Sequence, residues 1–257
     1  MSAVAVLLVG FISLGAGIFK NFILLILGIL TVLFITAGGN VINDYYDRDV
    51  DTINHPYRPI PAGEISPQKA LIYAVFLFTA GIFTSYMISQ CALLVASYAV
   101  FLLLLYESSL KSQGLVGNIA ISILVGMLFV FGGVVFGRLS LMLTFALMAF
   151  FANLGREIIK DIEDMAGDIN RKTLPKKIGR RYASLVAMFS ILTAVALSPI
   201  PYLFFSFSII YLIVVLFSDG IFIYASIIQF RDPHKGQKFT KYGMLVGLLA
   251  YLIGGLT

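Results

Sequence analysis

The sequence predicts an all-α, polytopic membrane protein with nine transmembrane helices in one bundle around a central polar chamber open to the cytoplasmic side. Of the 257 residues, 60% are hydrophobic and only 12% are charged, and the mean hydropathy is +0.97. A soluble domain usually carries about 25% charged residues. Apolar stretches recur along nearly the whole length, so residues 1–257 are expected to form a single transmembrane domain.

Nine apolar stretches could cross a hydrocarbon core of about 30 Å, which takes roughly 20 helical residues. In chain order, the predicted helices are Ala3–Phe19, Phe22–Gly39, Ala70–Ile88, Ala92–Tyr106, Leu115–Gly137, Leu139–Leu154, Tyr182–Leu197, Tyr202–Phe230 and Tyr242–Leu256. The first lacks the basic segment of a cleavable signal peptide, so it is taken as a span. Several stretches are shorter than 20 residues, and we expect those helices to continue into the adjoining polar segments.

Two of the predicted helices contain residues that are unusual for a membrane span. The fifth carries four glycines, which most simply allow close helix approach, and they are Gly126, Gly132, Gly133 and Gly137. The eighth contains Asp219, an acid inside an apolar stretch. An intramembrane acid is a functional candidate by default, but this helix is long, and we interpret Asp219 as an acid near a membrane surface.

The charged residues separate by side. Sixteen of the eighteen Lys and Arg lie in or beside the connections that follow the second, fourth, sixth and eighth helices, and only Lys20 and Arg138 lie opposite. The positive-inside rule makes that side cytoplasmic, with the N-terminus inside and the C-terminus outside. Because twelve of the thirteen acids gather there too, we expect a polar chamber at the cytoplasmic end of the bundle. Basic residues beside spans also explain the net charge of +5 without nucleic acid.

Two acidic segments repeat at an offset of 117 residues, from Asp44 to Asp161. Residues 38–51 read GGNVINDYYDRDVD and residues 155–168 read GREIIKDIEDMAGD, and both contain D-x-x-D-x-x-x-D. At about 100° per residue, positions i−4, i, i+3 and i+7 share one helical stripe. The first stripe is Asn40, Asp44, Asp47 and Asp51, and the second is Glu157, Asp161, Asp164 and Asp168. Asp49 and Glu163 point elsewhere and are expected to be solvated.

Carboxylates on one stripe repel one another unless cations neutralise them. With one Cys and two His in the chain, a metal would be bound by oxygen, and Mg²⁺ typically takes one or two carboxylates and shares itself with substrate phosphates. Six aspartates and a diphosphate carry more charge than two Mg²⁺ ions neutralise, so basic side chains must supply the rest. The candidates are Arg58, Lys111, Arg156, Lys160, Arg171 and Lys172.

The first motif reads N-D-x-x-D-x-x-x-D over Asn43–Asp51, and an N-x-x-x-R-P-I-P-x-G run follows over Asn54–Gly63. Together with the second aspartate motif, this pattern resembles the UbiA superfamily of intramembrane prenyltransferases over nearly the whole chain. Residues 155–168, with Glu157 and Lys160, look like the archaeal branch that acts in ether-lipid synthesis. The resemblance implies a Mg²⁺-dependent transfer of a geranylgeranyl group from its diphosphate to the sn-2 hydroxyl of geranylgeranylglyceryl phosphate, with membrane lipids around the protein.

The resemblance also implies roles for individual residues. Asn43, Asp44, Asp47, Asp161, Asp164 and Asp168 would surround Mg²⁺ and the diphosphate of a polyprenyl donor, Asp51 would close the first motif, and Arg58 would be a further phosphate contact. Tyr106, Lys111 and Asn118 look like a Tyr, a Lys and an Asn that family members carry after the fourth helix. Family members usually begin with an Arg-Pro-x-Asn run, and we expect that this segment is missing from the sequence.

The acceptor phosphate has its own candidate site. Arg171, Lys172, Lys176, Lys177, Arg180 and Arg181 follow the second motif, which is more positive charge than one diphosphate requires. Lys160 lies about 100° off the stripe of Glu157 and Asp161 and is expected to divide the donor and acceptor sites. Two alternatives stay open: an aromatic or porphyrin acceptor for the same chemistry and, more distantly, a cation-coupled transporter.

Overall fold

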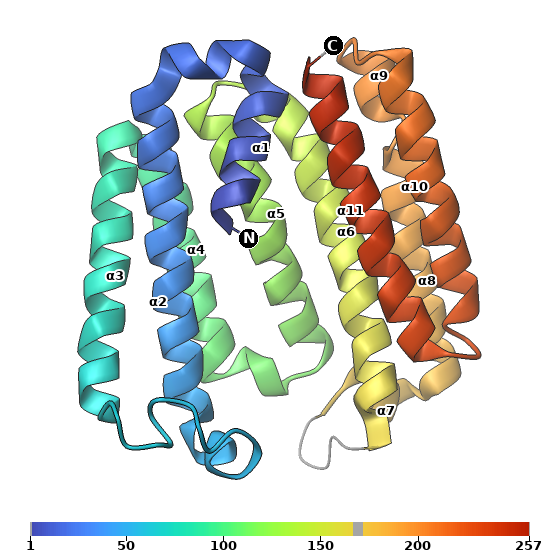
Figure 1. The fold of residues 1–257 in the computed structure, drawn as a ribbon. Coiled ribbons are helices and arrows are strands. Elements are labelled where there is room, and N and C mark those ends of the chain that lie inside the picture. Colours follow the sequence, from blue (N-terminus) through green and yellow to red (C-terminus); the bar gives the residue numbers. More distant parts are fainter. Residues whose placement is uncertain (1, 167–171, 257) are drawn as a thin grey trace.

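The structure is a computed structural model that describes residues 2–166 and 172–256, and within these ranges the chain is helical without strands (Figure 1). Eight helices are long and apolar enough to cross a membrane, counting α8 and α9 together. Their bounds are α2 Phe22–Asn54, α3 Pro67–Ile88, α4 Gln90–Ser108, α5 Leu115–Val135, α6 Leu139–Glu163, α8 Arg180–Leu197 with α9 Ile200–Phe204, α10 Ile209–Ile228 and α11 Pro233–Leu256. The shorter elements are α1 Ser2–Leu14, α7 Leu174–Ile178 and the 3₁₀ turns Gly15–Asn21, Leu110–Ser112 and Asp164–Ala166.

The first predicted span is not confirmed as a crossing. In place of a helix over Ala3–Phe19, α1 ends at Leu14 and a 3₁₀ turn follows. Thirteen helical residues extend about 20 Å, which is short of a hydrocarbon core of about 30 Å. The described residues therefore supply eight spans, and α1 packs inside the bundle against α2, α5 and α11.

Other helices also differ in their bounds from the predicted helices, some being longer and one shorter. α2 and α6 continue beyond their apolar stretches into the acidic segments, as predicted from the short stretches. The eighth prediction, Tyr202–Phe230, was wrong at its start, because the chain turns between α9 and α10 and Ser206 there has a positive φ of 59°. The turn reads FSFS and has no charged residue, glycine or proline, so hydropathy did not reveal it.

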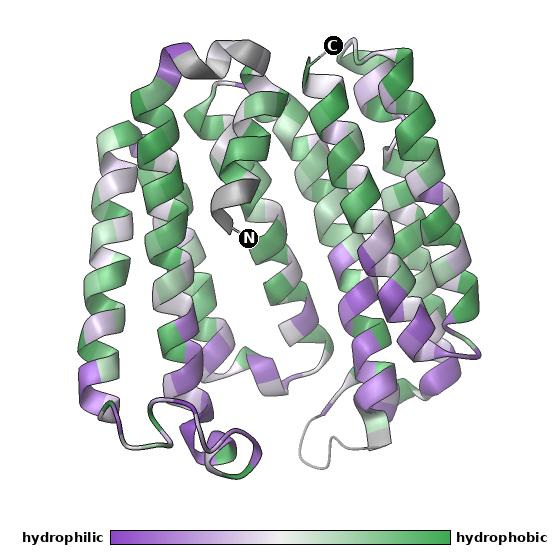
Figure 2. Cartoon of the chain, in the orientation of Figure 1, coloured by the Kyte–Doolittle hydropathy of each residue, from purple (hydrophilic) through white to green (hydrophobic). Residues whose placement is uncertain are grey.

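The charged connections gather at one end of the bundle. The polar residues of the α2–α3, α4–α5 and α10–α11 connections and of the lower part of α6 lie at the same end in Figure 2, while the other end is mostly apolar. The grouping of charged connections that the sequence predicted is therefore present in the structure. The C-terminus lies at the opposite, apolar end (Figure 1).

Close helix contacts involve three of the four glycines of the fifth predicted helix. A Cβ at Gly132 would meet Val9 of α1, one at Gly133 would meet Met142, and one at Gly126 would lie 2.9 Å from the carbonyl oxygen of Ala146. These glycines let α1 and α6 approach α5. Gly137 differs from the prediction: it follows α5, has a φ of +71° and has nothing within 4 Å of its Cβ position, so it serves the turn.

Asp219 is not a surface acid, which corrects the sequence interpretation. It lies within α10 with 6% of its surface exposed, and Ser198 at the end of α8 donates a hydrogen bond of 2.6 Å to its carboxylate. Tyr211 donates to the backbone oxygen of the same serine at 2.7 Å. These bonds tie α8 to α10 toward the apolar end, away from the acidic motifs.

The Asp219→Asn substitution keeps an oxygen that can accept the Ser198 hydrogen bond and removes a buried charge. We expect turnover within about threefold of wild type and an equal or slightly higher melting temperature in detergent, because a desolvated charge destabilises the folded state. Ser198→Ala is the control: it removes the donor, and we expect it to cost about 1–3 kcal/mol of stability. A folded Asp219→Asn protein with strongly reduced turnover would contradict a structural role.

Candidate active site

Helix α2 carries the first aspartate motif out of the membrane. Its 33 residues extend about 50 Å, which is well beyond a hydrocarbon core of about 30 Å. The helix is continuous to Asn54, so Asn40, Asp44, Asp47 and Asp51 lie on one stripe as predicted. Asp49 lies off the stripe with 85% of its side chain exposed, as expected for a solvated acid.

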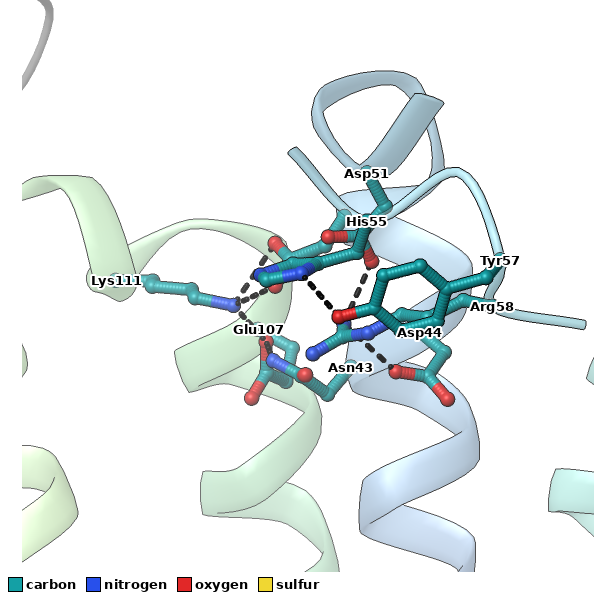
Figure 3. Close-up of polar contacts among 9 residues, drawn as sticks. Asn43, Asp44, Asp51, His55, Tyr57, Arg58, Glu107 and Lys111 are labelled. Carbon is teal, nitrogen blue, oxygen red and sulfur yellow. Dashed lines mark hydrogen bonds and ion pairs between the residues drawn. The ribbon is translucent and has the colours of Figure 1, made fainter. Parts of the chain in front are cut away.

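Arg58 closes the first motif from the α2–α3 loop (Figure 3). Its guanidinium donates to Asp51 at 2.6 Å and to Asp44 at 3.1 Å, and the Asp51 side chain is 6% exposed. The hydrogen bond to Asp51, with the charges of Asp51, Asp44 and Asp47, raises the pKa of Arg58 above its ordinary value. Arg58 therefore stays protonated and holds two motif carboxylates on one cation.

Lys111 binds Asp47, the remaining aspartate of the first stripe. Its ammonium donates to both oxygens of Asp47, at 2.9 and 2.7 Å, and to Glu107 at 3.0 Å. The same Glu107 oxygen accepts a 3.0 Å hydrogen bond from the amide of Asn43, so the carboxylate of Glu107 joins α2, α4 and the α4–α5 connection (Figure 3). Glu107 was not predicted as a site residue, although its spacing of four residues from Lys111 is a local signal for a helical ion pair.

The second motif departs from the predicted single helix. α6 ends at Glu163 and Asp164 begins a 3₁₀ turn, so only Glu157 and Asp161 share the α6 stripe, while Asp168 lies outside the described residues. The glycine at position 167 favours the end of the helix. Asp161 is 8% exposed and accepts a 2.7 Å hydrogen bond from the amide of Asn118 on α5.

Glu163 was predicted to be solvated, and this prediction was wrong. Its side chain is 28% exposed, His234 contacts one of its oxygens at 2.7 Å, and Gln237 donates to the other at 3.3 Å. Both partners lie on α11, which the hydropathy pattern predicted to begin only at Tyr242. The acid therefore ties the end of α6 to α11 and is not part of the aspartate site.

A series of side-chain hydrogen bonds links Arg156 on α6 to Asn118 on α5. Arg156 pairs with Glu157 and donates to the Asn153 side-chain oxygen at 3.3 Å. The Asn153 amide donates to Ser122 at 3.1 Å, and Ser122 donates to the backbone oxygen of Asn118 at 2.6 Å. The two predicted residues Arg156 and Glu157 are thus connected to Asn118 through residues that no sequence motif indicated.

The remaining basic candidates lie near the second motif. Lys160, Lys172 and Lys176 are exposed, and Arg171 lies outside the described residues. Within the described ranges Lys160 makes no side-chain hydrogen bond or ion pair with the motif residues. The backbone N–H of Lys172 donates to the Ser112 oxygen at 3.4 Å, and a Cβ at Gly114, whose φ is +60°, would lie 2.2 Å from the Lys172 oxygen. The chain after the second motif therefore packs against the connection that carries Lys111.

An apolar cavity of about 480 Å³ opens beside the first motif. Asn40, Asn43, Tyr106, Glu107 and Lys111 line its polar end, and side chains of α2, α4 and α5 line the rest. A second, smaller cavity of about 190 Å³ lies among α5, α6, α8, α10 and α11 and includes Asp219. The two cavities share Val125 and Leu128 of α5.

The donor atoms of the first motif suit a hard cation. Residues 2–166 and 172–256 contain no group of three or more His, Cys, Asp or Glu side chains arranged to hold a metal. Mg²⁺ does not need such a group, because it commonly takes one or two carboxylates and completes its coordination with water and phosphate oxygens. The carboxylates of Asp44 and Asp47 and the side-chain oxygen of Asn43 are donors of this type, so the residues fit Mg²⁺ with a phosphorylated ligand.

The fold and site define a class of protein: a membrane-embedded enzyme that handles a charged headgroup on an apolar chain. Carboxylates and cations gather at the polar end of the bundle, directly beside an apolar cavity within it. Residues 3–249 match the model of the UbiA prenyltransferase family, and the chain belongs to this family. It is therefore a membrane prenyltransferase.

Relatives and solved structures extend this assignment. The chain is 38% identical over 239 residues to digeranylgeranylglyceryl phosphate synthase of Methanosphaera stadtmanae, which covers 90% of this chain and 88% of the relative. A solved structure of digeranylgeranylglyceryl phosphate synthase superposes with a TM-score of 0.91 at 34% identity, over 99% of this chain and 93% of the other. A UbiA homologue from Archaeoglobus fulgidus with bound GPP and Mg²⁺ shares the fold, with a TM-score of 0.67 at 21% identity, over 99% and 95% of the two chains.

The Asn118→Leu substitution tests the buried bond to the second motif. It leaves the Asp161 carboxylate buried without its amide donor, so we expect a loss of about 1–3 kcal/mol in unfolding free energy and reduced turnover. Thermal unfolding in detergent with a parallel activity assay measures both. Gln113→Leu is the matched control, because Gln113 is exposed in the same region and should change stability by less than about 0.5 kcal/mol. Equal melting temperatures for the two variants would argue against the bond.

Proposed function

We propose that the protein transfers a geranylgeranyl group from geranylgeranyl diphosphate to the sn-2 hydroxyl of geranylgeranylglyceryl phosphate and releases diphosphate. The observation that carries this proposal is the apolar cavity with Asn43, Glu107 and Lys111 at its polar end, beside Asp44 and Asp47. The 38% identity to a digeranylgeranylglyceryl phosphate synthase supports this acceptor over an aromatic one.

The donor diphosphate binds at the polar end in this proposal. Asp44, Asp47 and Asn43 of the first motif and Asp161 and Asp164 of the second would hold Mg²⁺, and Arg58 orients Asp51. Bound Mg²⁺ would act as a Lewis acid that neutralises the negative charge on the leaving diphosphate. The homologue solved with GPP and Mg²⁺ supports the presence of both ligands at such a site.

The chain's own cations complete the charge balance. Arg58 and Lys111 pair with carboxylates, and diphosphate oxygens compete for the same N–H groups when the donor binds. They stabilise the charge that develops as the bond between the allylic carbon and the diphosphate breaks. The acceptor hydroxyl oxygen then bonds to that carbon, and its proton passes to a diphosphate oxygen or a carboxylate. The apolar walls exclude water that would otherwise capture the allylic cation.

The acceptor phosphate binds to basic residues in and after the second motif segment. Arg156 on α6 and exposed Lys172 and Lys176 lie on this side, with Arg171 between them in sequence. A phosphate carries nearly two negative charges and gains from several cations, whereas a carboxylate needs about one. Lys160 separates this cluster from the donor carboxylates, and the packing of Lys172 on the Lys111 connection brings the two regions together.

The membrane orientation follows from the same charges. Sixteen of eighteen Lys and Arg lie in or beside the connections of the charged end, and by the positive-inside rule we propose that this end and the active site face the cytoplasm. Helix α11 ends at the opposite end of the bundle (Figure 1), so in this proposal the C-terminus faces the outside. The cytoplasmic N-terminus stays a prediction, because α1 starts part-way along the bundle and is not one of the eight spans (Figure 1).

Removal of one metal ligand tests the Mg²⁺ site. We expect no transfer in EDTA and at least about a hundredfold lower turnover for Asp47→Asn, because loss of the ligand misplaces the leaving group as well as its charge. Asp49→Asn is the matched control, since Asp49 is exposed on the same helix. The assay measures product from labelled geranylgeranyl diphosphate. Equal activities of the two variants, or full activity in EDTA, would refute the metal site.

A second pair of substitutions tests how the acceptor is recognised. Lys172→Ala combined with Lys176→Ala should raise the acceptor KM at least about tenfold more than the donor KM, because lost cations weaken phosphate binding. Geranylgeranylglycerol without its phosphate should be a poor substrate of the wild-type enzyme. Comparable kinetics with and without the phosphate, or efficient prenylation of hydroxybenzoate, would assign the protein to another branch of the family.

A further inference from the structure

The larger cavity has a defined depth along two helices. Its lining on α2 runs from Asn43 at the polar end to Thr31, and its lining on α4 runs from Glu107 to Val95. The two ends of each run are twelve positions apart, which at a rise of about 1.5 Å per residue corresponds to roughly 18 Å. Both helices therefore give the same depth, measured from the residues beside the first motif.

The deep end of the cavity is closed. Val32 and Phe131 line it and are 6% and 4% exposed. Thr31 is 1% exposed and shares a 2.9 Å hydrogen bond with Thr84 of α3. One turn beyond, a Cβ at Gly28 would contact both Phe131 and Val6 of α1. Val6 of helix α1 therefore packs behind the deep end of the cavity.

The depth corresponds to one particular chain length. The main chain of a geranylgeranyl group has sixteen carbons and extends roughly 19 Å, taking C–C bonds of about 1.5 Å at tetrahedral angles. A farnesyl chain extends roughly 14 Å and a C25 chain roughly 24 Å on the same basis. The extended length of one isoprene unit is close to the pitch of an α-helix, which is about 5.4 Å. Each turn of α4 along the cavity therefore corresponds to about one isoprene unit.

The cavity has a volume of about 480 Å³ and runs from the first motif to the deep end. The reaction involves two isoprenoid chains, of which the donor's begins at the diphosphate. Since this cavity opens beside the first aspartate motif and Lys111, its occupant is the donor chain.

We propose that the deep end of this cavity, formed by Val32, Val95 and Phe131, limits the donor to a C20 chain. This inference rests on the proposed prenyl transfer and adds the residues that select the length. Small residues on α4 keep the space open, since Ala96 and Ala99 face the cavity where larger side chains would fill it. A bulky residue at Ala99 shortens the cavity by about one turn.

The experiment compares farnesyl, geranylgeranyl and C25 prenyl diphosphates as donors with geranylgeranylglyceryl phosphate. Wild-type enzyme should prefer C20, with kcat/KM at least about tenfold lower for C25, because the added unit cannot be buried. Ala99→Phe should reverse the preference of C20 over C15. Phe131→Ala should accept C25 within about threefold of C20, since the removed ring extends the cavity.

Ala149→Phe is the matched control, because Ala149 is a partly buried alanine that lines only the smaller cavity. It should keep the wild-type length preference. A shift with Ala149→Phe and none with Ala99→Phe would overturn the proposal and place the donor chain in the smaller cavity. Ala99→Phe adds a side chain to open space, so it tests the proposal even where Phe131→Ala fails to fold.

The proposed function is tested separately by the wild-type product. If wild-type enzyme transfers no prenyl group to geranylgeranylglyceryl phosphate, the function fails, and the length preference is then measured as the Kd of the three diphosphates. A preference for C20 that shifts to C15 in Ala99→Phe supports the cavity assignment in either case. Equal Kd values for all three donors would refute it.

Discussion

The structure depends on the neutralisation of carboxylates at one end of an apolar bundle. Three aspartates on one stripe of α2 would repel one another and the donor without cations, and Arg58 and Lys111 supply two of these. Neither cation belongs to α2, so the loop to α3 and the connection after α4 are both drawn to this helix. Phosphate binding and local folding therefore use the same side chains, and the site is held together before substrate arrives.

The regions that carry the two aspartate motifs are joined by contacts made mostly by non-acidic residues. Asn118 of α5 donates to Asp161 of α6, and the segment at Lys172 packs on Gly114 and Ser112 beside Lys111. Gly114 is required there, because a side chain would collide with the Lys172 backbone. These contacts connect the half of the bundle with the first motif to the half with the second, so a substrate that binds both motifs finds them already placed.

The sequence predicted what is periodic and local, and it failed where a contact is distant. The aspartate stripe, the extension of α2 and the charged end follow from spacing and composition. The spacing of Glu107 from Lys111 was a local signal that we overlooked, but its contact with Asn43, 64 residues away, could not be predicted. Glu163 was misread because His234 lies on another helix. The hydropathy pattern correctly placed Asp219 inside a helix. It could not reveal that Ser198 donates a hydrogen bond to the Asp219 carboxylate. The turn before α10 was not predicted, because its two serines stand between phenylalanines in a long apolar stretch.

The two ends of the bundle serve opposite requirements. The polar end must exchange water, Mg²⁺ and phosphates, so it is built from charges that can change partners. Toward the apolar end, Phe145 and Tyr251 pack with ring centroids 4.3 Å apart within the main buried cluster, and α1 covers the deep end of the donor cavity. Rigid packing there gives the cavity a definite length. The polar end thus supplies the chemistry, while the apolar end determines which chain can reach it.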